Sequence, residues 1–415
     1  MAATPYSLEP ALARQIRRNE RLFIIQVMWV MPFVVIQQQY VPVLATRLGA
    51  SPLLLGVLTS GSALALTTAS VLARWYLQRA PNAMRALIAP VFLSRLSLAL
   101  IPLVLLLPDH QAEALVAAAL AINLIIGVVQ VTFFAFLPKV TLAERVAVLM
   151  GGRWTGLGLA MAIGTPAMAV ILDRLEMPVN YVVACGVVIA AGIVEIFIFS
   201  AVKPLPAPAR SPARQSAARD LGDILKHGPA ARYLVVTLAA QLALNASAPL
   251  IPLKLVRELG ASDTAYGWYI TVYWLALAAM GAIIPRLVRR FGNQRMFALG
   301  GAGIGAQMLV LALAQNLPAT WAAGAIGGLA SGLFQVTAFG LVVENAPPDR
   351  YESFVSAQLS VANFAIFAGP LLMSGLLSAG LSVGVGLIVC AGGNALSSAL
   401  ASALSLGRQD AHQRG

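Results

Sequence analysis

The decapeptide GVVQVTFFAF at residues 127–136 returns as GLFQVTAFGL at residues 332–341, so nearly the same apolar stretch occurs twice, 205 positions apart. Both copies hold a glutamine and a threonine at the same place among apolar neighbours. The tetrapeptide LGAS at 48–51 also recurs, at 259–262, with a shift of 211 residues. Self-similarity over a long, nearly fixed period is typical of a chain built from repeated folding units. The sequence therefore predicts a tandem duplication.

The composition places both copies in a membrane. Hydrophobic residues make up 59% and charged residues 11% of the 415 residues, whereas soluble domains carry roughly a quarter charged residues. Apolar stretches of about 20 residues recur along the chain, and each can cross a hydrocarbon core of about 30 Å as an α-helix. We predict an all-α integral membrane protein with 12 transmembrane helices in two pseudo-symmetric six-helix bundles. The predicted spans are 22–44, 52–77, 84–107, 112–137, 150–172, 179–202, 233–255, 266–288, 296–314, 319–343, 354–377 and 381–404.

The most polar interior stretch, residues 203–228, is rich in proline, alanine and arginine and lies between the sixth and seventh predicted spans. Such a composition is typical of a linker. We therefore divide the chain into an N-terminal six-helix bundle at 1–202, a cytoplasmic linker at 203–230 and a C-terminal six-helix bundle at 231–415.

The net charge of +12 follows the membrane topology. With the N-terminus in the cytoplasm, 23 of the 28 lysines and arginines fall in inner segments and four in outer ones. This is the positive-inside pattern, which sets orientation and gives no support for a nucleic-acid partner. We expect a multi-pass protein of the bacterial inner membrane with both termini cytoplasmic and no cleaved signal. Cys185 and Cys390 fall inside predicted spans and indicate buried thiols rather than a disulfide or metal site.

The loop between the eighth and ninth predicted spans, Gly281–Arg295, resembles the basic loop pattern G-x3-G-R-x-x-D-R-x-G-x-x-R of the major facilitator superfamily, and the resemblance in topology covers essentially the whole chain. It is nearest in style to bacterial efflux-type members. Gln78 and Arg289 replace the family's aspartate, so its acidic cytoplasmic latch is not expected here. The resemblance implies a cytoplasmic gate, and solvated positive-inside charges are the alternative reading of the same residues. The gate candidates are Arg79, Arg145, Arg290 and Arg350.

In that family, helices one, four, seven and ten face a central cavity at the bilayer midplane. The matching spans here carry amides and aromatic residues at helical spacing, for example the stripe of Gln26, Trp29, Phe33, Gln37 and Tyr40. Amides in hydrocarbon need partners, so they face either another helix or a wet cavity. Packing and substrate contact remain equal alternatives for the symmetric glutamines at 130 and 335. The expected substrate cavity is lined by Gln37, Tyr40, Gln130, Gln241, Asn245, Tyr269, Tyr273 and Gln335.

Two ionisable side chains lie clearly inside predicted spans, Arg95 in the third and Glu195 in the sixth. At 1.5 Å per residue both lie roughly 12–16 Å from the inner end of their helices. An isolated charge at that depth is costly, so each needs a partner or a water path. One hypothesis is an ion pair that braces the N-terminal half, and the other is a proton-carrying role for Glu195 in coupling.

These features favour a secondary transporter that moves a small organic solute by alternating access. The expected cavity holds amides, aromatics and aliphatics without a carboxylate, which favours efflux of an uncharged or amphipathic compound. The alternatives are a facilitator or uptake carrier for a polar neutral solute, and a non-transporting receptor or assembly factor with the same fold. The sequence offers no arrangement for enzymatic chemistry, a cofactor or a metal ion. The expected partners are the solute, the lipid bilayer and protons as a candidate coupling ion, for a monomer.

Overall fold

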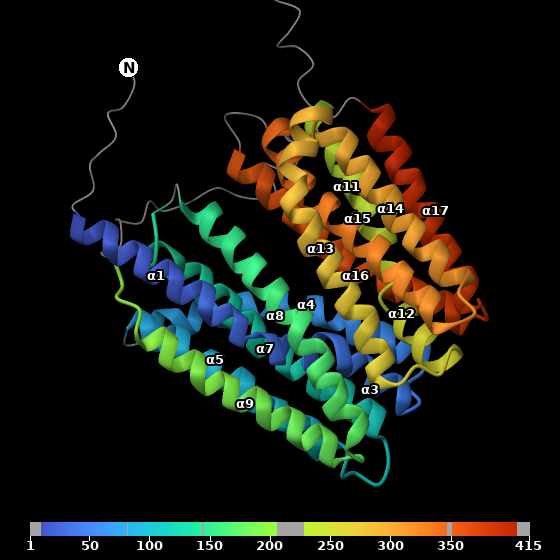
Figure 1. Ribbon diagram of the computed structural model, residues 1–415, viewed down its shortest axis with the longest axis horizontal. Coiled ribbons are helices and arrows are strands. Elements are labelled where there is room, and N and C mark those ends of the chain that lie inside the picture. The colour runs from blue at the N-terminus through green and yellow to red at the C-terminus, as the bar shows by residue number, and fades with distance from the viewer. Residues whose placement is uncertain (1–9, 81, 143–144, 206–227, 347–350, 405–415) are drawn as a thin grey trace, which may run out of the picture.

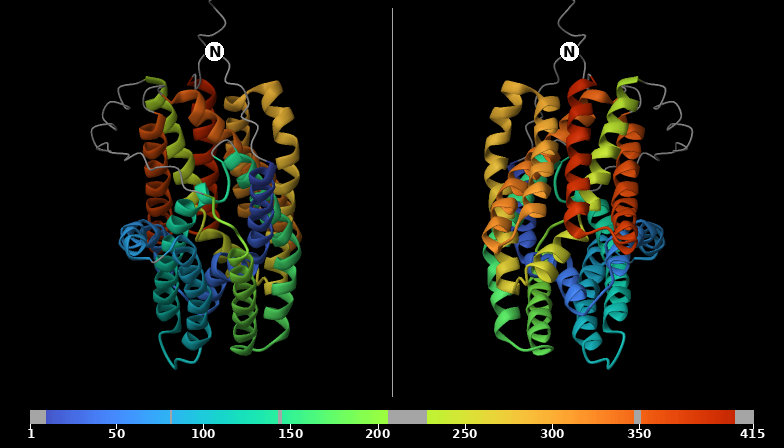
Figure 2. Two further views of the ribbon diagram at one scale, coloured as in Figure 1. Left: turned by 90° about the vertical axis from the view of Figure 1, so that its left-hand side faces the viewer. Right: turned by 90° about the vertical axis from the view of Figure 1, so that its right-hand side faces the viewer.

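A computed structural model describes residues 10–80, 82–142, 145–205, 228–346 and 351–404. Its helices form two bundles, one coloured blue to green and the other yellow to red (Figures 1 and 2). The N-terminal bundle contains α1 (Pro10–Trp29), α2 (Met31–Val34), the π-helical η1 (Val35–Tyr40), α3 (Val41–Arg47), α4 (Pro52–Arg79), α5 (Ala83–Leu96), α6 (Leu100–Val104), α7 (Gln111–Phe136), α8 (Val146–Arg174) and α9 (Val179–Ser200).

The C-terminal bundle repeats the plan. It contains α11 (Gly228–Ala246), α12 (Leu250–Pro252), the π-helical η5 (Leu253–Glu258), α13 (Asp263–Phe291), α14 (Asn293–Leu313), α15 (Leu317–Asn345), α16 (Tyr351–Ser378) and α17 (Val383–Ala403). In the part of the chain that the structure describes, eleven helical stretches are long and apolar enough to span a membrane, and the Pro52–Ala65 part of α4 is a shorter apolar helix. The predicted all-α membrane fold is confirmed.

The helix ends follow from local sequence. In the repeated tetrapeptide, Gly49 and Gly260 have φ angles of +82° and +63°, a region that glycine enters at little cost. The serine that closes each copy caps the next helix, since Ser51 accepts from the N–H of Leu54 and Ser262 accepts from that of Ala265. The repeat is therefore the turn that reverses the chain after the first span of each bundle.

One prediction missed the length of the first helix. We expected a span from residue 22, whereas the continuous helical stretch runs over Pro10–Arg47. Its first turns are polar on one face and pack on the other, where Ile16 and Asn19 are buried. Residues 206–227 of the predicted linker lie outside the described residues, and its last three residues, 228–230, belong to α11.

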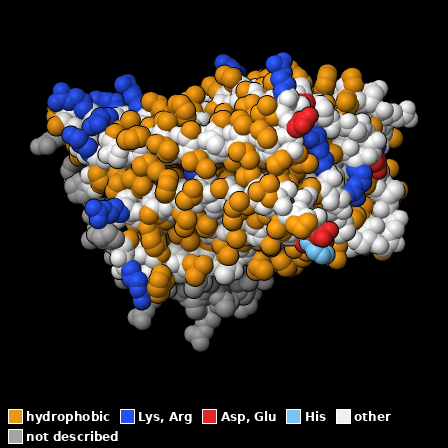
Figure 3. Space-filling view, turned by 90° about the horizontal axis from the view of Figure 1, so that it is seen from below, with side chains coloured by type: hydrophobic (Ala, Val, Ile, Leu, Met, Phe, Trp, Pro, Cys, Tyr) orange, Lys and Arg blue, Asp and Glu red, His pale blue; other side chains and the backbone are white. Residues whose placement is uncertain are grey.

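The molecule has two chemically different ends. We call the end where α9 finishes and α11 begins the linker end, and the opposite end, where α3 and η5 finish, the seal end. Hydrophobic side chains cover the middle of the face in Figure 3, and lysines and arginines gather towards the side where α1 begins. The two bundles converge near α3 and α12 and diverge towards the start of α1 (Figure 1).

The bundles touch along two helix pairs, α4 with α16 and α8 with α13. Each crossing has a glycine at the same place in the repeat, Gly56 on α4 and Gly267 on α13. A methyl group on Gly267 would lie 2.7 Å from Cβ of Ala169 and 2.8 Å from Oη of Tyr40. Small residues let helix backbones approach closely in membranes, where van der Waals contact drives association.

We predict that Gly267→Ala weakens the contact between the bundles, because the added methyl group has no room. The expected loss is about 1–3 kcal/mol, typical of overpacking, seen as a lower melting temperature of the purified protein in detergent. Gly281→Ala is the matched control on the same helix, since a methyl group there would meet nothing within 4 Å. Equal melting temperatures for the two variants would contradict this account of the crossing.

Candidate functional site

Arg95 on α5 and Glu195 on α9 form a buried, bidentate ion pair. Nε of Arg95 lies 2.9 Å from Oε1 of Glu195, and Nη2 lies 3.1 Å from Oε2. The two residues are 4% and 0% exposed. Gly192, one turn before Glu195, provides the space, because a methyl group there would lie 2.6 Å from Cγ of Arg95. The structure thus brings together the two ionisable side chains that the sequence singled out.

A second arginine joins this pair through an amide. Gln26 of α1 donates from Nε2 to Oε2 of Glu195 at 2.8 Å, and its Oε1 accepts from Nη1 of Arg153 at 2.9 Å. An amide nitrogen can only donate and an amide oxygen can only accept, so the neighbouring charges fix the orientation of Gln26. Nη1 of Arg153 also donates to the carbonyl of Phe23 at 2.6 Å. The set holds two guanidiniums and one carboxylate, a net charge of +1.

Arg153 lies where three helices meet. Its backbone belongs to α8, its two acceptors belong to α1, and its guanidinium carbon lies 4.6 Å from the ring centroid of Phe133 on α7. It is the seventh residue after the start of α8 at Val146, which corresponds to about 10 Å of helix. The Arg153 side chain is only partly buried, in contrast to Arg95 and Glu195. The network therefore runs from two buried side chains, Arg95 and Glu195, to one that is partly exposed, Arg153.

The stripe predicted on the first helix does not all face one cavity. Gln26 turns into the N-terminal bundle, and the ring of Phe33 lies 3.9 Å from the guanidinium carbon of Arg95. The reason is that the buried ion pair needs a polar donor and a ring face, and α1 supplies the donor while α2 supplies the ring. Gln37 is 6% exposed and sits in η1, and none of the described residues provides a partner for its Oε1.

The remaining predicted cavity residues lie in several environments. Tyr40 is fully buried and donates to the carbonyl of Asp263, and Tyr269 accepts from Gln307 within the C-terminal bundle. Asn245 donates to the carbonyl and Oε1 of Gln241, at 2.7 and 3.2 Å, beside the helix break at residues 247–249. Gln241, Asn245 and Tyr273 are half-buried, and Gln130 and Gln335 are exposed.

The predicted gate residues do not join the two bundles among the described residues. Arg145 pairs with Glu20 at 2.6 Å inside the N-terminal bundle, and these hydrogen bonds raise the pKa of its guanidinium. Arg79 and Arg290 stack on neighbouring rings, 4.2 Å from the ring centroid of Trp75 and 5.2 Å from that of Phe291. Arg350 lies outside the described residues.

The hydrogen bonds that do join the bundles cluster at the seal end. Asp263, the first residue of α13, is 1% exposed and pairs with Arg47 at the end of α3. The carboxylate of Asp173, at the end of α8, accepts from the backbone N–H groups of Asp263 and Thr264 at 2.7 Å each. A carboxylate at a helix N-terminus satisfies free N–H groups and complements the helix dipole.

Arg257 completes this cluster, which we call the seal. Its Nη2 donates to the carbonyls of Thr46 and Ala50, at 3.3 and 2.9 Å. Under the 211-residue shift Arg257 is equivalent to Thr46, so this contact lies across the pseudo-twofold axis. The sequence analysis missed the seal. The available signal was a set of opposite charges in short loops at one predicted face of the membrane.

Comparison with known proteins agrees with this architecture. A family described as Major Facilitator Superfamily matches residues 233–414. A puromycin resistance protein of Streptomyces alboniger is 32% identical over 126 residues, which are 29% of this chain and 25% of that protein. A crystal structure of the nucleoside transporter NupG superposes with a TM-score of 0.71 at 12% identity, covering 94% of this chain and 99% of that one. An auto-inhibited POT family peptide transporter gives 0.68 at 12% identity, with coverages of 94% and 96%. Residues 233–414 thus match the Major Facilitator Superfamily in sequence, and the chain as a whole shares the fold of these solved transporters.

The family match begins at residue 233, so the N-terminal bundle and its buried charges lie outside it. The identities to the solved structures are low enough that they show the fold alone. The aligned part is about a quarter of the length of the puromycin resistance protein. The comparisons therefore assign no role to the network of Arg95, Glu195, Gln26 and Arg153, and its role is argued from its geometry.

We predict that Glu195→Gln sharply lowers the yield of folded protein and its melting temperature. The change leaves Arg95 without the carboxylate that pairs with it, and breaking a buried pair costs about 3–5 kcal/mol. Adding Arg95→Gln should recover much of the loss, because the buried cation is then removed as well. Glu113→Gln is the control, since that carboxylate is 63% exposed.

Normal stability of Glu195→Gln would contradict the bracing role. If that stable variant also lost transport driven by a pH gradient in liposomes, the proton-carrying role would be supported instead.

Proposed function

We propose that this protein is a secondary transporter of the bacterial inner membrane that exports a small amphipathic organic compound by alternating access. The observation that carries the proposal is the position of the seal. Among the described residues, the side-chain hydrogen bonds that join the two bundles lie at the seal end. The bundles diverge towards the linker end (Figure 1). This is the arrangement of a carrier closed on one side.

Two further observations support the proposal. Gln130 and Gln335 occupy equivalent positions in the repeat, lie well inside α7 and α15, and are exposed. An amide without a protein partner is costly in hydrocarbon, so a wet path between the bundles explains both exposed side chains better than lipid does. The resemblance to a puromycin resistance protein favours efflux over uptake.

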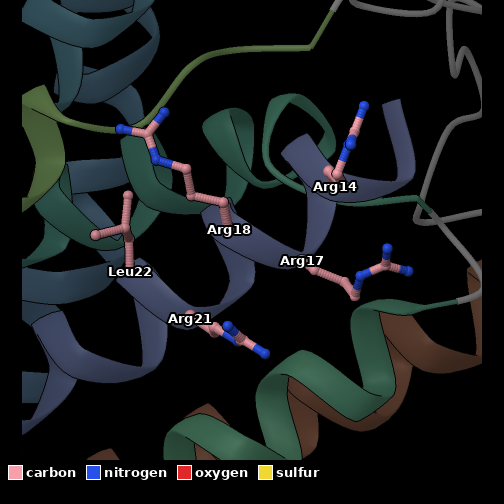
Figure 4. Close-up of a pocket in the computed structure, with 5 residues that line it drawn as sticks. All are labelled: Arg14, Arg17, Arg18, Arg21 and Leu22. Carbon is pink, nitrogen blue, oxygen red and sulfur yellow. The ribbon is translucent and has the colours of Figure 1, made fainter. Parts of the chain in front are cut away.

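The orientation proposed for the carrier follows from charge. The arginines on the first turns of α1 (Figure 4) lie at the linker end, where Arg18 donates to the carbonyl of Ala201 just after α9. Basic residues concentrate on the cytoplasmic side of membrane proteins. The linker end is then cytoplasmic, and the seal closes the outer side.

The experiment that tests the function uses the full chain in proteoliposomes. Solute panels that include amphipathic drugs and nucleosides are loaded, and release is followed with and without a pH gradient. Saturable, protein-dependent release of an amphipathic compound supports export. Solute movement at the same rate with and without a pH gradient identifies a facilitator. Absence of any movement or counterflow, with binding retained, identifies a receptor and overturns the proposal.

We predict that Asp263→Asn favours the state in which the seal is open. The change removes the negative partner of Arg47, and because Arg47 is partly exposed we expect a shift of about 1–3 kcal/mol. Spin labels at Gln78→Cys and Arg289→Cys, in a background lacking Cys185 and Cys390, report the distance between the bundles at the linker end. The label distance should shorten as that end closes.

The control for the seal is Glu258→Gln. Glu258 lies at the same end but pairs with Lys254 inside the C-terminal bundle, at 3.0 Å. The Glu258→Gln variant should have the same distribution of spin-label distances as the parent protein. If Asp263→Asn and Glu258→Gln behave alike, the ion pair with Arg47 does not hold the seal.

A further inference from the structure

Three arginines of the N-terminal bundle project into or beside its interior, and two of them bind a carboxylate in the same way. Arg95 presents Nε and Nη2 to the two oxygens of Glu195, at 2.9 and 3.1 Å. Arg145 presents the same edge to Glu20, at 2.8 and 2.6 Å. The planar guanidinium matches a carboxylate in this two-bond geometry.

Arg153 is the third arginine, and its corresponding edge is free. Both of its hydrogen bonds use Nη1 and go to neutral carbonyl oxygens, those of Phe23 and Gln26. None of the described residues provides an acceptor for its Nε or Nη2, and no described carboxylate pairs with it. Glu195 already has both oxygens bonded to Arg95, and Gln26 separates it from Arg153.

A cation about 10 Å along a membrane helix needs a counter-charge or water. Neutral carbonyls hold the Arg153 guanidinium in place but leave the network with one positive charge in excess. The side chain is partly exposed, so a ligand arriving from the linker end can reach it. The free edge of Arg153, formed by Nε and Nη2, which we call the fork, therefore has the position, charge and geometry of a binding group.

The surroundings of the fork are aromatic. The guanidinium carbon lies 4.6 Å from the ring centroid of Phe133 and 5.5 Å from that of Phe23. Trp154, the next residue on α8, is 57% exposed. A ligand that places an anionic group on the fork would lay an apolar or aromatic body along these rings, which suits an amphipathic molecule.

The approach to this site is electropositive. Four arginines and a leucine on the first turns of α1 line an open hollow of about 260 Å³ at the linker end (Figure 4). Arg18 in this hollow also donates to the carbonyl of Ala201 at 3.1 Å, which ties the helix start to the end of α9. A surface of one sign raises the local concentration of oppositely charged solutes. The hollow would attract anions to the end of the molecule from which α1 leads to Phe23 and Gln26, the two residues that bind Arg153.

From these observations we infer that the transported compound is an organic anion, a carboxylate carried on an apolar or aromatic body, and that Arg153 binds the carboxylate through Nε and Nη2. This inference rests on the proposed function, because it names the substrate class of the same carrier. It narrows the expectation drawn from the amide-lined spans, which had favoured an uncharged or amphipathic compound.

The test compares 2-naphthoate with its methyl ester, which keeps the aromatic body and removes the charge. Binding of each is measured by thermal shift and calorimetry on the full chain in phosphatidylcholine nanodiscs, where no anionic lipid competes. The parent protein should bind the acid about tenfold or more tightly than the ester, the size expected for a charge-assisted hydrogen-bonded pair. Arg153→Gln should abolish that preference and leave ester binding within about twofold.

Two further variants separate binding from structure. Gln26→Glu places a carboxylate of the chain beside Arg153, so it should also abolish the preference for the acid while Arg153 is still present. Arg21→Gln removes a charge from the α1 hollow and should slow acid binding while keeping the preference. Arg153→Gln removes an uncompensated cation and should melt no lower than the parent protein.

Each outcome decides the inference. Equal affinity for acid and ester in the parent protein, or an equal loss of both probes in Arg153→Gln, would mean that Arg153 only anchors α1, and the inference is overturned. Proteoliposome transport of neutral compounds by the same preparation would leave the proposed function standing in that case. A parent protein that moves no solute at all, yet binds the acid through Arg153, would overturn the transport proposal and keep the site.

Discussion

A charged side chain inside a membrane protein must find an opposite charge, and the N-terminal bundle is organised around this constraint. Arg95 and Glu195 meet between α5 and α9 only because Gly192 leaves space for the arginine stem. Gln26 links this pair to Arg153. Its Nε2 donates to Glu195 and its Oε1 accepts from Arg153, so the neighbouring charges fix the orientation of the amide. Four helices, α1, α5, α8 and α9, are thereby held together by polar contacts that lipid cannot replace.

The described residues of the C-terminal bundle do not repeat this arrangement. Under the 205-residue shift Glu195 corresponds to Leu400 and Arg153 to Gln358, both uncharged. The two bundles kept the same helices and turns while one of them acquired, or the other lost, a buried ionic network. The seal breaks the symmetry in the same way, because Arg47 and Asp263 correspond to Glu258 and Pro52. Among the described residues, one ion pair therefore crosses the axis where perfect repetition would have required two.

The sequence predicted the fold well because hydrophobic length is a local property. All twelve predicted spans overlap helices of the structure, and the ion pair could be anticipated from two charges at equal depth. Helical spacing gave the polar stripe of α1 but not the direction in which it faces, so Gln26 was expected in a cavity and lies against Glu195. Contacts of the seal join residues more than 200 positions apart, such as Arg47 and Asp263. They depend on how the bundles are tilted, which no local pattern encodes.

The asymmetry has a consequence for how such a carrier could work. If the bundles rock about the α4–α16 and α8–α13 crossings, the seal must break each time the outer side opens, and Asp263 and Arg47 must then be solvated by water. The Arg95–Glu195 pair lies within one bundle and need not change in that motion. Arg153 also bonds within the N-terminal bundle, so its bonds to Phe23 and Gln26 need not break in that motion. Arg153, with Nε and Nη2 free, could therefore keep a ligand bound while the bundles move. Arg47 is paired with Asp263 and could only stabilise the closed state of the seal.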